Sequence, residues 1–260
     1  MPHTWDPDRY LTYADERGRP FVELIARIGA DAPRTVVDLG CGPGNLTSLL
    51  RGRWPDAAIA GRDSSPEMIE KARAAEPDID FEVADVRTWV ESADPVDVLV
   101  SNAMLQWVPG HLDLLPGLVD RVSAGGWLAF QVPGNFGEPS HVTRTELAGE
   151  EPYAAHTAGV AVPSSHDPAV YLDALAALGC EVDVWETTYL HVLTGPDPVF
   201  TWVSGTGARP TLQALPDDLR RAFEEEFKRR LRAAYPEHDG RVVLPFRRIF
   251  AVARVPGGGR

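Results

Sequence analysis

The sequence contains little cysteine, no long apolar run and fewer basic than acidic residues, and each shortage excludes a class of protein. Only two of its 260 residues are cysteines, Cys41 and Cys180, which is too few for a disulfide framework. No run approaches the length that crosses a bilayer, and the first residues lack the basic start and apolar stretch of a secretory signal. We therefore expect a cytoplasmic protein with no membrane partner.

The shortage of positive charge points to a small substrate. Lysine and arginine together number 25 against 38 acidic residues, which gives a formal net charge of −13. Such a surface repels nucleic acid phosphates, so a nucleic-acid partner is disfavoured. It also repels an anionic metabolite at long range, so cationic side chains placed locally must hold any such substrate. The composition carries no information on oligomeric state.

What the sequence does contain is an alternation of short β-branched runs with helical patterns, typical of a parallel sheet with crossover helices. The runs predict strands at 35–39, 57–61, 80–83, 96–101 and 127–132, with helices at 45–53, 66–75 and 111–122. Ser65 is placed to cap the second helix, and Pro66 suits its first turn. Two later strands, at 180–192 and 248–255, predict an antiparallel pair. We expect an α/β fold: a Rossmann-like seven-stranded sheet with an antiparallel last strand pair and helices on both faces.

The remaining segments interrupt this pattern without indicating a second domain. A chain of this length buries one substantial core, so we expect a single domain over 1–260. Residues 1–30 are predicted to form a lid, and helical insertions at about 133–178 and 194–243 to form a cap over the substrate. Within the first insertion, 134–166 is predicted to be a long loop with one helical piece. In the second, an apolar side chain recurs every four residues at Leu219, Phe223, Phe227 and Leu231, the stripe of an amphipathic helix.

A glycine-rich turn follows the first predicted strand. Gly40, Gly42 and Gly44 alternate in VVDLGCGPGN, where glycine allows positive φ and lets a ligand approach without a Cβ in the way. The spacing is GxGxG, whereas a dinucleotide-binding turn has GxGxxG. A loop that is not built around a pyrophosphate can close on an amino-acid tail instead. The structural alternative is a tight strand-to-helix turn that binds no ligand.

Two acidic residues strengthen the ligand interpretation. Asp63 ends the second predicted strand, where its carboxylate can accept hydrogen bonds from both ribose hydroxyls. Asp85 follows the third, where it can accept from an exocyclic adenine amine. An isolated Asp after a strand is more often a helix cap. Three such features at neighbouring strand ends together favour an adenosine whose other end is not a diphosphate.

The motifs DLGCGPG, GRDSSPEMI, VADVRTW and DVLVSNAMLQWV resemble the series of class I S-adenosylmethionine methyltransferases. The resemblance implies that the glycines lie beside the methionine part of S-adenosyl-L-methionine, that Asp38 anchors the loop and the cofactor's amino group, and that Met68 packs on the adenine. The cofactor-binding residues that it implies are Asp38, Gly40, Cys41, Gly42, Gly44, Asn45, Asp63, Ser64, Met68, Asp85, Val86 and Asn102. One departure is Arg62, where the family usually has an aliphatic residue.

Segments outside these motifs narrow the resemblance. The opening WDPDRYLTYADERGRPFVELIARI, then SNAMLQWVPGH, QVPGNFGEPSH, GCEVDVWETTYLHVL, WVSGTGARP and LPFRRIFAVAR are similar to the trans-aconitate 2-methyltransferase family over nearly the whole chain. That family makes the monomethyl ester of a three-carboxylate acid. A carboxylate is already ionised at neutral pH, its reference pKa being about 4, so no general base, catalytic residue or metal is expected. Holding the oxygen in line with the sulfonium methyl group is the expected source of catalysis.

A polycarboxylate substrate requires hydrogen-bond donors, preferably arginine. The candidates are Arg209 and Arg247, with Arg248 placed below them, although an arginine in a loop is more often a surface charge. The other substrate-binding candidates are Tyr189 and His191 on the polar face of the sixth strand, and Trp107 and Gln131 near the ends of strands four and five. Tyr10, Tyr13 and Arg19 are predicted to belong to the lid, and the basic run 228–232 to be a solvated helix end.

Three alternatives keep part of this interpretation. A methyltransferase acting on a carbon or phenol oxygen of another small metabolite would have a pocket without arginine pairs and with a general base. A non-catalytic nucleotide-binding module would have no closed acceptor pocket. A nicotinamide oxidoreductase is disfavoured by the loop spacing and by Asp85.

Overall fold

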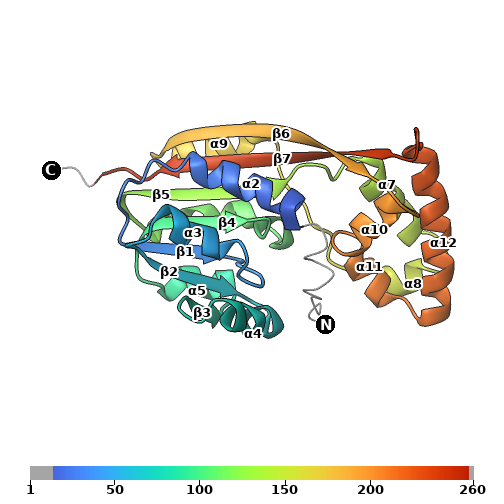
Figure 1. Ribbon diagram of the computed structural model, residues 1–260, viewed down its shortest axis with the longest axis horizontal. Helices are drawn as coiled ribbons and strands as arrows, with labels where there is room; N and C mark the ends of the chain where they lie inside the picture. Colours follow the sequence, from blue (N-terminus) through green and yellow to red (C-terminus); the bar gives the residue numbers. More distant parts are fainter. Residues whose placement is uncertain (1–13, 258–260) are drawn as a thin grey trace.

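The computed structural model describes residues 14–257 and shows one seven-stranded mixed sheet (Figure 1). The strand order is β3-β2-β1-β4-β5-β7-β6. Strands β1 to β5 are parallel, while β7 runs antiparallel to both β5 and β6. The strands are β1 Thr35–Leu39, β2 Ala58–Asp63, β3 Asp80–Val83, β4 Val96–Asn102, β5 Val122–Pro133, β6 Glu181–Leu193 and β7 Val242–Arg254. The fold class predicted from the sequence is confirmed.

Both faces of the sheet are buried because its central strands carry apolar residues at successive positions. Val36 and Val37 of β1 are 0% and 7% exposed, and they belong to two separate clusters on opposite faces. One face is covered by α2 Ala14–Ala26, α3 Thr47–Arg53 and α4 Pro66–Ala75. The other is covered by α5 Val86–Ser92, α6 Leu115–Asp120 and α9 Pro168–Ala177. The predicted cap on α4 is present, since Ser65 Oγ accepts from Met68 N at 3.2 Å.

A separate group of helices, here called the helical lobe, lies beyond one end of the sheet (Figure 1). It contains α7 Pro139–Ala148, α8 Ala154–Thr157, α10 Pro198–Ser204, α11 Arg209–Ala214 and α12 Asp217–Ala234, packed around a third apolar cluster. Phe223, Phe227 and Leu231 of α12 are buried there, which confirms the predicted stripe. The long strands β6 and β7 run from the sheet to this lobe.

The segment predicted as a long loop forms two of the lobe's helices. α7 and α8 lie within 134–166, where a single helical piece was predicted. Gly, Pro and Ser are frequent in this segment, which hid the helical pattern, and its buried residues contact the lobe rather than the sheet. Helix α9, in contrast, packs on β6 and β7, with Tyr171 and Leu175 fully buried in the sheet's own cluster.

Two element boundaries differ from the prediction because of strand pairing. β5 begins at Val122, which pairs with Val96, so the predicted helix at 111–122 is reduced to the 3-10 turn η2 His111–Leu114 and to α6. β7 begins at Val242 rather than at 248, since its first residues pair with the end of β6. Within residues 14–257, no helix is long and apolar enough to cross a membrane.

Candidate active site

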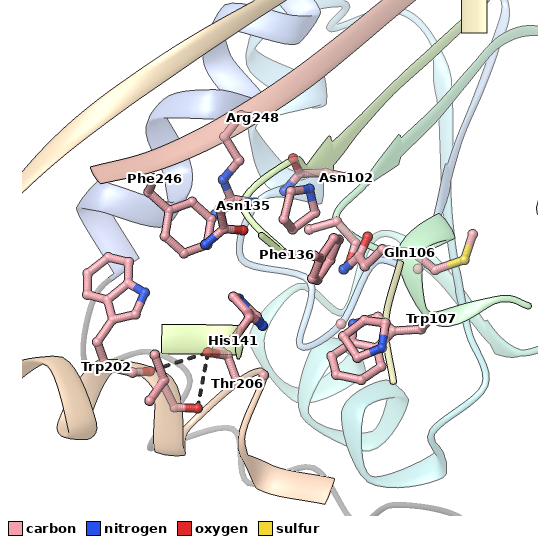
Figure 2. Close-up of a pocket in the computed structure, with 18 of the residues that line it drawn as sticks. Asn102, Gln106, Trp107, Asn135, Phe136, His141, Trp202, Thr206, Phe246 and Arg248 are labelled. Atoms are coloured by element: carbon pink, nitrogen blue, oxygen red, sulfur yellow. Dashed lines mark hydrogen bonds between the residues drawn. The ribbon is translucent and has the colours of Figure 1, made fainter. Parts of the chain in front are cut away.

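A cavity of about 200 Å³ lies between the sheet and the helical lobe, at the carboxyl ends of β1, β2, β4 and β5 (Figure 2). The strand order reverses between β1 and β4, and in open α/β sheets ligands bind beyond the strand ends at such a point. Loop and strand-end residues form the sheet side of the cavity. Side chains from α7, α10 and the turn after α10 form the lobe side. The 3-10 turn η1 Leu105–Trp107 closes a third side, and Trp107 lines the cavity as a substrate-binding candidate.

The three glycines after β1 all have positive φ, between 55° and 80°, but the surroundings of Gly42 differ from those of the other two. A Cβ on Gly40 would lie 2.4 Å from the Met104 side chain, and one on Gly44 would lie 2.9 Å from Ala72 Cβ. Both are therefore required for packing. A Cβ on Gly42 would meet no atom within 4 Å, and Gly42 lines the cavity. Gly42 is the glycine whose missing side chain leaves space for a ligand.

Asp63 connects the end of β2 to the glycine loop. Its Oδ2 accepts from Gly42 N and its Oδ1 from Ser65 N, each at 2.9 Å. Asp63, Ser64 and Met68 all line the cavity. Burial raises the pKa of the Asp63 carboxyl, while the backbone donors oppose this shift. Asp63 therefore fixes the loop and presents polar atoms to the ligand space.

Asp85 acts as a helix cap in this structure. Its Oδ1 accepts from Arg87 N at 2.8 Å at the start of α5, and the residue is exposed. Asp85 does not line the cavity, although the pairing of Asp63 with Val83 places it at the same edge of the sheet. The capping alternative considered from the sequence is therefore correct, and an additional contact with adenine stays a prediction.

Other members of the predicted cofactor set lie behind the cavity wall. Cys41, Gly44, Asn45 and Val86 do not line the cavity, whereas Asn102 does. The thiol of Cys41 is buried, which raises its pKa. The departure from the family pattern, Arg62, is satisfied by acidic residues on β3: its guanidinium lies 2.8 Å from Asp80 and 3.5 Å from Glu82.

Asp38 supports the loop from below. It is 2% exposed, and its Oδ2 accepts from Thr47 Oγ1 at 2.7 Å. Burial raises the pKa of this carboxyl to about 7, with a smaller contribution from the charge of Asp63. The carboxyl therefore resists ionisation until a positive group or a higher pH compensates it.

This raised pKa predicts how stability depends on pH. Below pH 3.8 Asp38 is protonated in both the folded and the unfolded chain. Between that value and about 7 only the unfolded chain ionises, so the free energy of unfolding falls by up to ~1.4 kcal/mol per pH unit. Asp38→Asn should remove this effect. The melting temperature of the variant minus that of the wild type should therefore be larger at pH 8 than at pH 5. An equal difference at both pH values would show that Asp38 ionises normally.

The adjacent arginines of β7 point to opposite sides of the sheet. Arg248 lines the cavity, is 7% exposed and donates from Nη1 to Gln131 Oε1 at 3.0 Å. Arg247 points away and donates from Nε to Glu186 Oε2 at 2.9 Å, with Asp167 also nearby. Arg248, which was placed below Arg247 as a candidate, is therefore the one of the two that lines the cavity. Figure 2 shows the Arg248 side chain entering the cavity from β7 beside Phe246.

Gln131 lies behind the wall and connects the two halves of the site. It is 1% exposed and does not line the cavity. Its Nε2 donates to Asn102 Oδ1 at 2.9 Å, while its Oε1 accepts from Arg248. A buried chain of hydrogen bonds therefore joins Asn102 on the sheet side to Arg248.

The remaining substrate candidates lie outside the cavity lining. Tyr189 is buried under α2, where its hydroxyl donates to Glu23 Oε2 at 2.7 Å and Arg19 stacks on its ring. The face of β6 predicted to be polar is therefore covered by a helix. His191 packs on Trp202 with ring centroids 4.4 Å apart. Arg209, half-buried at the start of α11, does not line the cavity. Tyr10 and Tyr13 lie outside the described residues.

Several polar lining residues were missed from the sequence. Gln106 and Asn135 are 5% and 3% exposed, and their Oε1 and Oδ1 atoms have no hydrogen-bond partner among the described residues. An unsatisfied buried polar atom costs about 1–3 kcal/mol, so both indicate a polar ligand. Asn135 and His141 belong to QVPGNFGEPSH, one of the segments that carried the resemblance, and this was the available signal.

His141 lines the lobe side and is uncharged at neutral pH. It is 8% exposed, and burial followed by the charge of Arg144 lowers its pKa to about 4. Its ring meets Phe136 edge-to-face at 5.0 Å. With Trp107, Trp202 and Phe246, these rings form an apolar wall around the polar groups. A neutral imidazole here can donate a hydrogen bond but is a poor general base.

The lining fits an adenosine with an amino-acid tail better than a diphosphate. The ligand space at Gly42 adjoins the carboxylate of Asp63 and the amide of Asn102. Among the described lining residues, Arg248 is the only arginine or lysine, and it lies beside Phe246 and Asn135. The cavity thus offers an acidic cradle and, separately, a cationic group for a second ligand.

The chain is similar in sequence to known methyltransferases. Residues 13–183 match a family described as a methyltransferase domain. The trans-aconitate 2-methyltransferase of Streptomyces coelicolor is 53% identical over 98% of this chain and 88% of its own length. The protein of the same name from Mycobacterium tuberculosis is 49% identical over 98% of both chains. Among solved structures, the YcgJ protein of Bacillus subtilis has a TM-score of 0.60 at 13% identity, over 92% of this chain and 99% of that one, which shows the fold alone.

Proposed function

Because this chain belongs to the trans-aconitate 2-methyltransferase family of S-adenosylmethionine-dependent methyltransferases, we propose that its cavity holds the cofactor on the sheet side and trans-aconitate on the Arg248 side. The reaction is a carboxyl O-methylation that produces the monomethyl ester. The observation that carries the proposal is one arginine, 7% exposed, entering the same cavity as the glycine loop and Asp63. A related small polycarboxylate would satisfy the same geometry.

The chain's own residues bind the cofactor and the substrate and orient them relative to each other. S-adenosylmethionine, when bound, supplies a methyl group activated by its sulfonium sulfur. Gly42 leaves room for the cofactor, Asp63 accepts from its ribose hydroxyls, and Asn102 lines the methionine end. Arg248 holds a carboxylate group of the substrate with charge-assisted hydrogen bonds, which are about twice as strong as neutral ones. Gln131 fixes the guanidinium relative to Asn102, and so relative to the cofactor.

No residue of the cavity has to remove a proton. The attacking carboxylate is ionised at neutral pH, since its reference pKa is about 4. The imidazole of His141 has a pKa of about 4 and takes no proton at pH 7. The aromatic wall excludes water from the reacting oxygen and strengthens the attraction of Arg248 for its carboxylate. Orientation of this kind is worth roughly 7–11 kcal/mol in well-aligned reactions.

The helical lobe and the residues before α2 complete the proposal. The lobe supplies Phe136, His141 and Trp202 to the acceptor half, as a substrate cap would. The cytoplasmic location and a lid formed by the residues before α2 remain parts of the proposal that rest on the sequence. Helix α2, which the predicted lid at 1–30 included, packs on the sheet with Phe21 and Leu24 fully buried. A methyltransferase for an apolar metabolite would have no use for a buried arginine in the acceptor half, so Arg248 favours the polycarboxylate.

One experiment tests the activity. Purified protein is incubated with methyl-labelled S-adenosylmethionine and a panel of di- and tricarboxylic acids, and the labelled products are identified. We expect a monomethyl ester of trans-aconitate, formed faster than any other ester. Label found in a carbon-bound methyl group or an aryl ether, or no transfer to any acid, would contradict the proposal.

Gly42→Ala tests the cofactor half. Its φ of 55° makes any Cβ strained, at about 1–2 kcal/mol, but the new methyl group meets no protein atom. It would project into the ligand space, so we expect cofactor affinity to fall on the order of 10-fold or more while the fold persists. Gly240→Ala is the matched control, with a φ of 73°, an open Cβ position and no place in the cavity lining. Equal calorimetric affinities for both variants would remove Gly42 from the cofactor site.

A further inference from the structure

Arg144, on the inner side of the helical lobe, is a buried cation without a carboxylate partner within residues 14–257. It is 3% exposed, and its guanidinium donates to the Gly207 carbonyl and to Thr145 Oγ1. No acidic group among the described residues pairs with it, and burial alone lowers its pKa. A buried charge that lacks its counter-ion is strongly destabilising, so an external anion is the expected compensation.

Other arginines of the lobe show the ordinary arrangement. Arg230 pairs with Glu150 and Glu226, and Arg232 pairs with Asp197, all near the surface. The lobe therefore does not lack acidic residues for pairing. Arg144, in contrast, is buried and has no acidic partner among the described residues, and its hydrogen-bond acceptor Gly207 lines the cavity.

His141 stands between this charge and the cavity. It belongs to α7, three residues before Arg144, and its ring lies so close to Gly207 that a Cβ there would be 2.8 Å from His141 Cε1. Gly207 is also the residue whose carbonyl accepts from Arg144. The charge of Arg144 already disfavours protonation of the ring, so the two groups interact electrostatically. Figure 2 shows His141 in the cavity together with Thr206, on the lobe side, whereas Arg248 enters from β7 beside Phe246 and Asn135.

We propose that Arg144, acting through His141, makes the lobe side of the cavity a second carboxylate subsite, so that the enzyme selects acids with carboxylate groups at both Arg248 and His141. Arg144 is a positioning residue in this arrangement, because it does not line the cavity. The neutral imidazole and the amide of Asn135 supply hydrogen bonds, and the buried guanidinium supplies the positive potential. Because Arg248 and His141 are fixed in position, the site also selects acids by the distance between their two carboxylate groups. This distance differs between the cis and trans isomers of a rigid unsaturated acid. This inference rests on the proposed function.

The test measures binding, so it does not depend on turnover. Trans-aconitate, glutaconate and itaconate are titrated by calorimetry into protein saturated with S-adenosylhomocysteine; each dicarboxylate is trans-aconitate without one carboxylate group. We expect Arg144→Met and His141→Gln to lower the affinity for trans-aconitate on the order of 10-fold or more. The affinity for at least one of the two dicarboxylates should fall by less than about twofold. Arg144→Lys should recover part of the loss. Arg230→Met, which removes an outward-facing charge from the same lobe, should leave the affinities for all three acids unchanged.

Several outcomes would overturn the subsite. One is an equal loss for all three acids in both variants, with the affinity for S-adenosylhomocysteine unchanged. Another is no loss for any acid. If Arg144→Met lowers the melting temperature sharply, His141→Gln carries the decision, since it leaves the guanidinium and its bond to Gly207 in place. Wild-type protein that binds trans-aconitate with the expected selectivity but forms no ester would contradict the proposed function and leave the subsite supported.

Discussion

Replacing Arg248 by methionine is expected to raise the KM for trans-aconitate on the order of 100-fold, because truncating one partner of a buried charge pair costs roughly 2–5 kcal/mol. Methionine keeps an unbranched apolar side chain but removes the guanidinium, including its contact with the Phe246 ring, whose centroid lies 4.5 Å from the guanidinium carbon. The dissociation constant of the cofactor should stay within about twofold, since Asp63 and the glycine loop are unchanged. Steady-state kinetics with each substrate varied in turn measures both quantities.

Arg247→Met is the matched control for this variant. The two residues are neighbours on β7 and have the same side chain, but Arg247 forms ion pairs with Glu186 and Asp167 on the other side of the sheet. Such partly exposed pairs contribute about 0–1 kcal/mol, so we expect nearly normal kinetics. If both variants raise the KM equally, or if Arg247→Met alone does, the acceptor site does not lie where Arg248 enters the cavity.

Replacing Asp63 by alanine is expected to lower cofactor affinity by about 100-fold or more. A hydrogen bond to a charged group contributes roughly 1.5–3 kcal/mol, and this carboxylate serves two ribose hydroxyls. The variant also removes the acceptor for Gly42 N and Ser65 N, which loosens the glycine loop. Calorimetric titration with S-adenosylhomocysteine measures the loss directly.

Two further variants separate these effects. Asp63→Asn keeps the shape and one acceptor oxygen, so it should retain the melting temperature better than Asp63→Ala while still binding the cofactor weakly. Asp56→Ala removes an exposed carboxylate before the start of β2 and should bind normally. Near-normal affinity in both Asp63 variants would show that the ribose is held elsewhere.

The sheet side of the cavity was predictable in part from the sequence, because the features that form it are local; Gly42, Asp63 and Asn102 line the cavity as expected. The glycine loop, Asp63 and the cap at Ser65 each depend on residues within a few positions of one another, and strand-to-helix turns of this kind have characteristic spacing. Asp85 shows the limit of such reasoning. A carboxylate after a strand suits a helix cap and a ligand contact equally, and the structure shows the cap.

The acceptor half was less predictable because it depends on long-range contacts. β7 lies between β5 and β6, so Ile249, Phe250 and Ala251 are all buried, and no polar–apolar alternation shows which arginine points inward. Tyr189 was predicted to bind the substrate from the polar face of β6, because the sequence does not reveal that α2 covers this face. His141 and Asn135 were hidden in a segment rich in glycine and proline, and only its packing in the lobe brings them to the cavity.

The most direct measurement is a crystal structure of the protein with S-adenosylhomocysteine and trans-aconitate. We expect the cofactor's ribose within hydrogen-bond distance of Asp63, one carboxylate group at about 3 Å from the Arg248 guanidinium, and a carboxylate oxygen facing the sulfur. The same map would show whether another carboxylate group reaches His141. An acid bound away from Arg248, or a cofactor whose ribose does not touch Asp63, would contradict the account of this cavity as the site of carboxyl methylation.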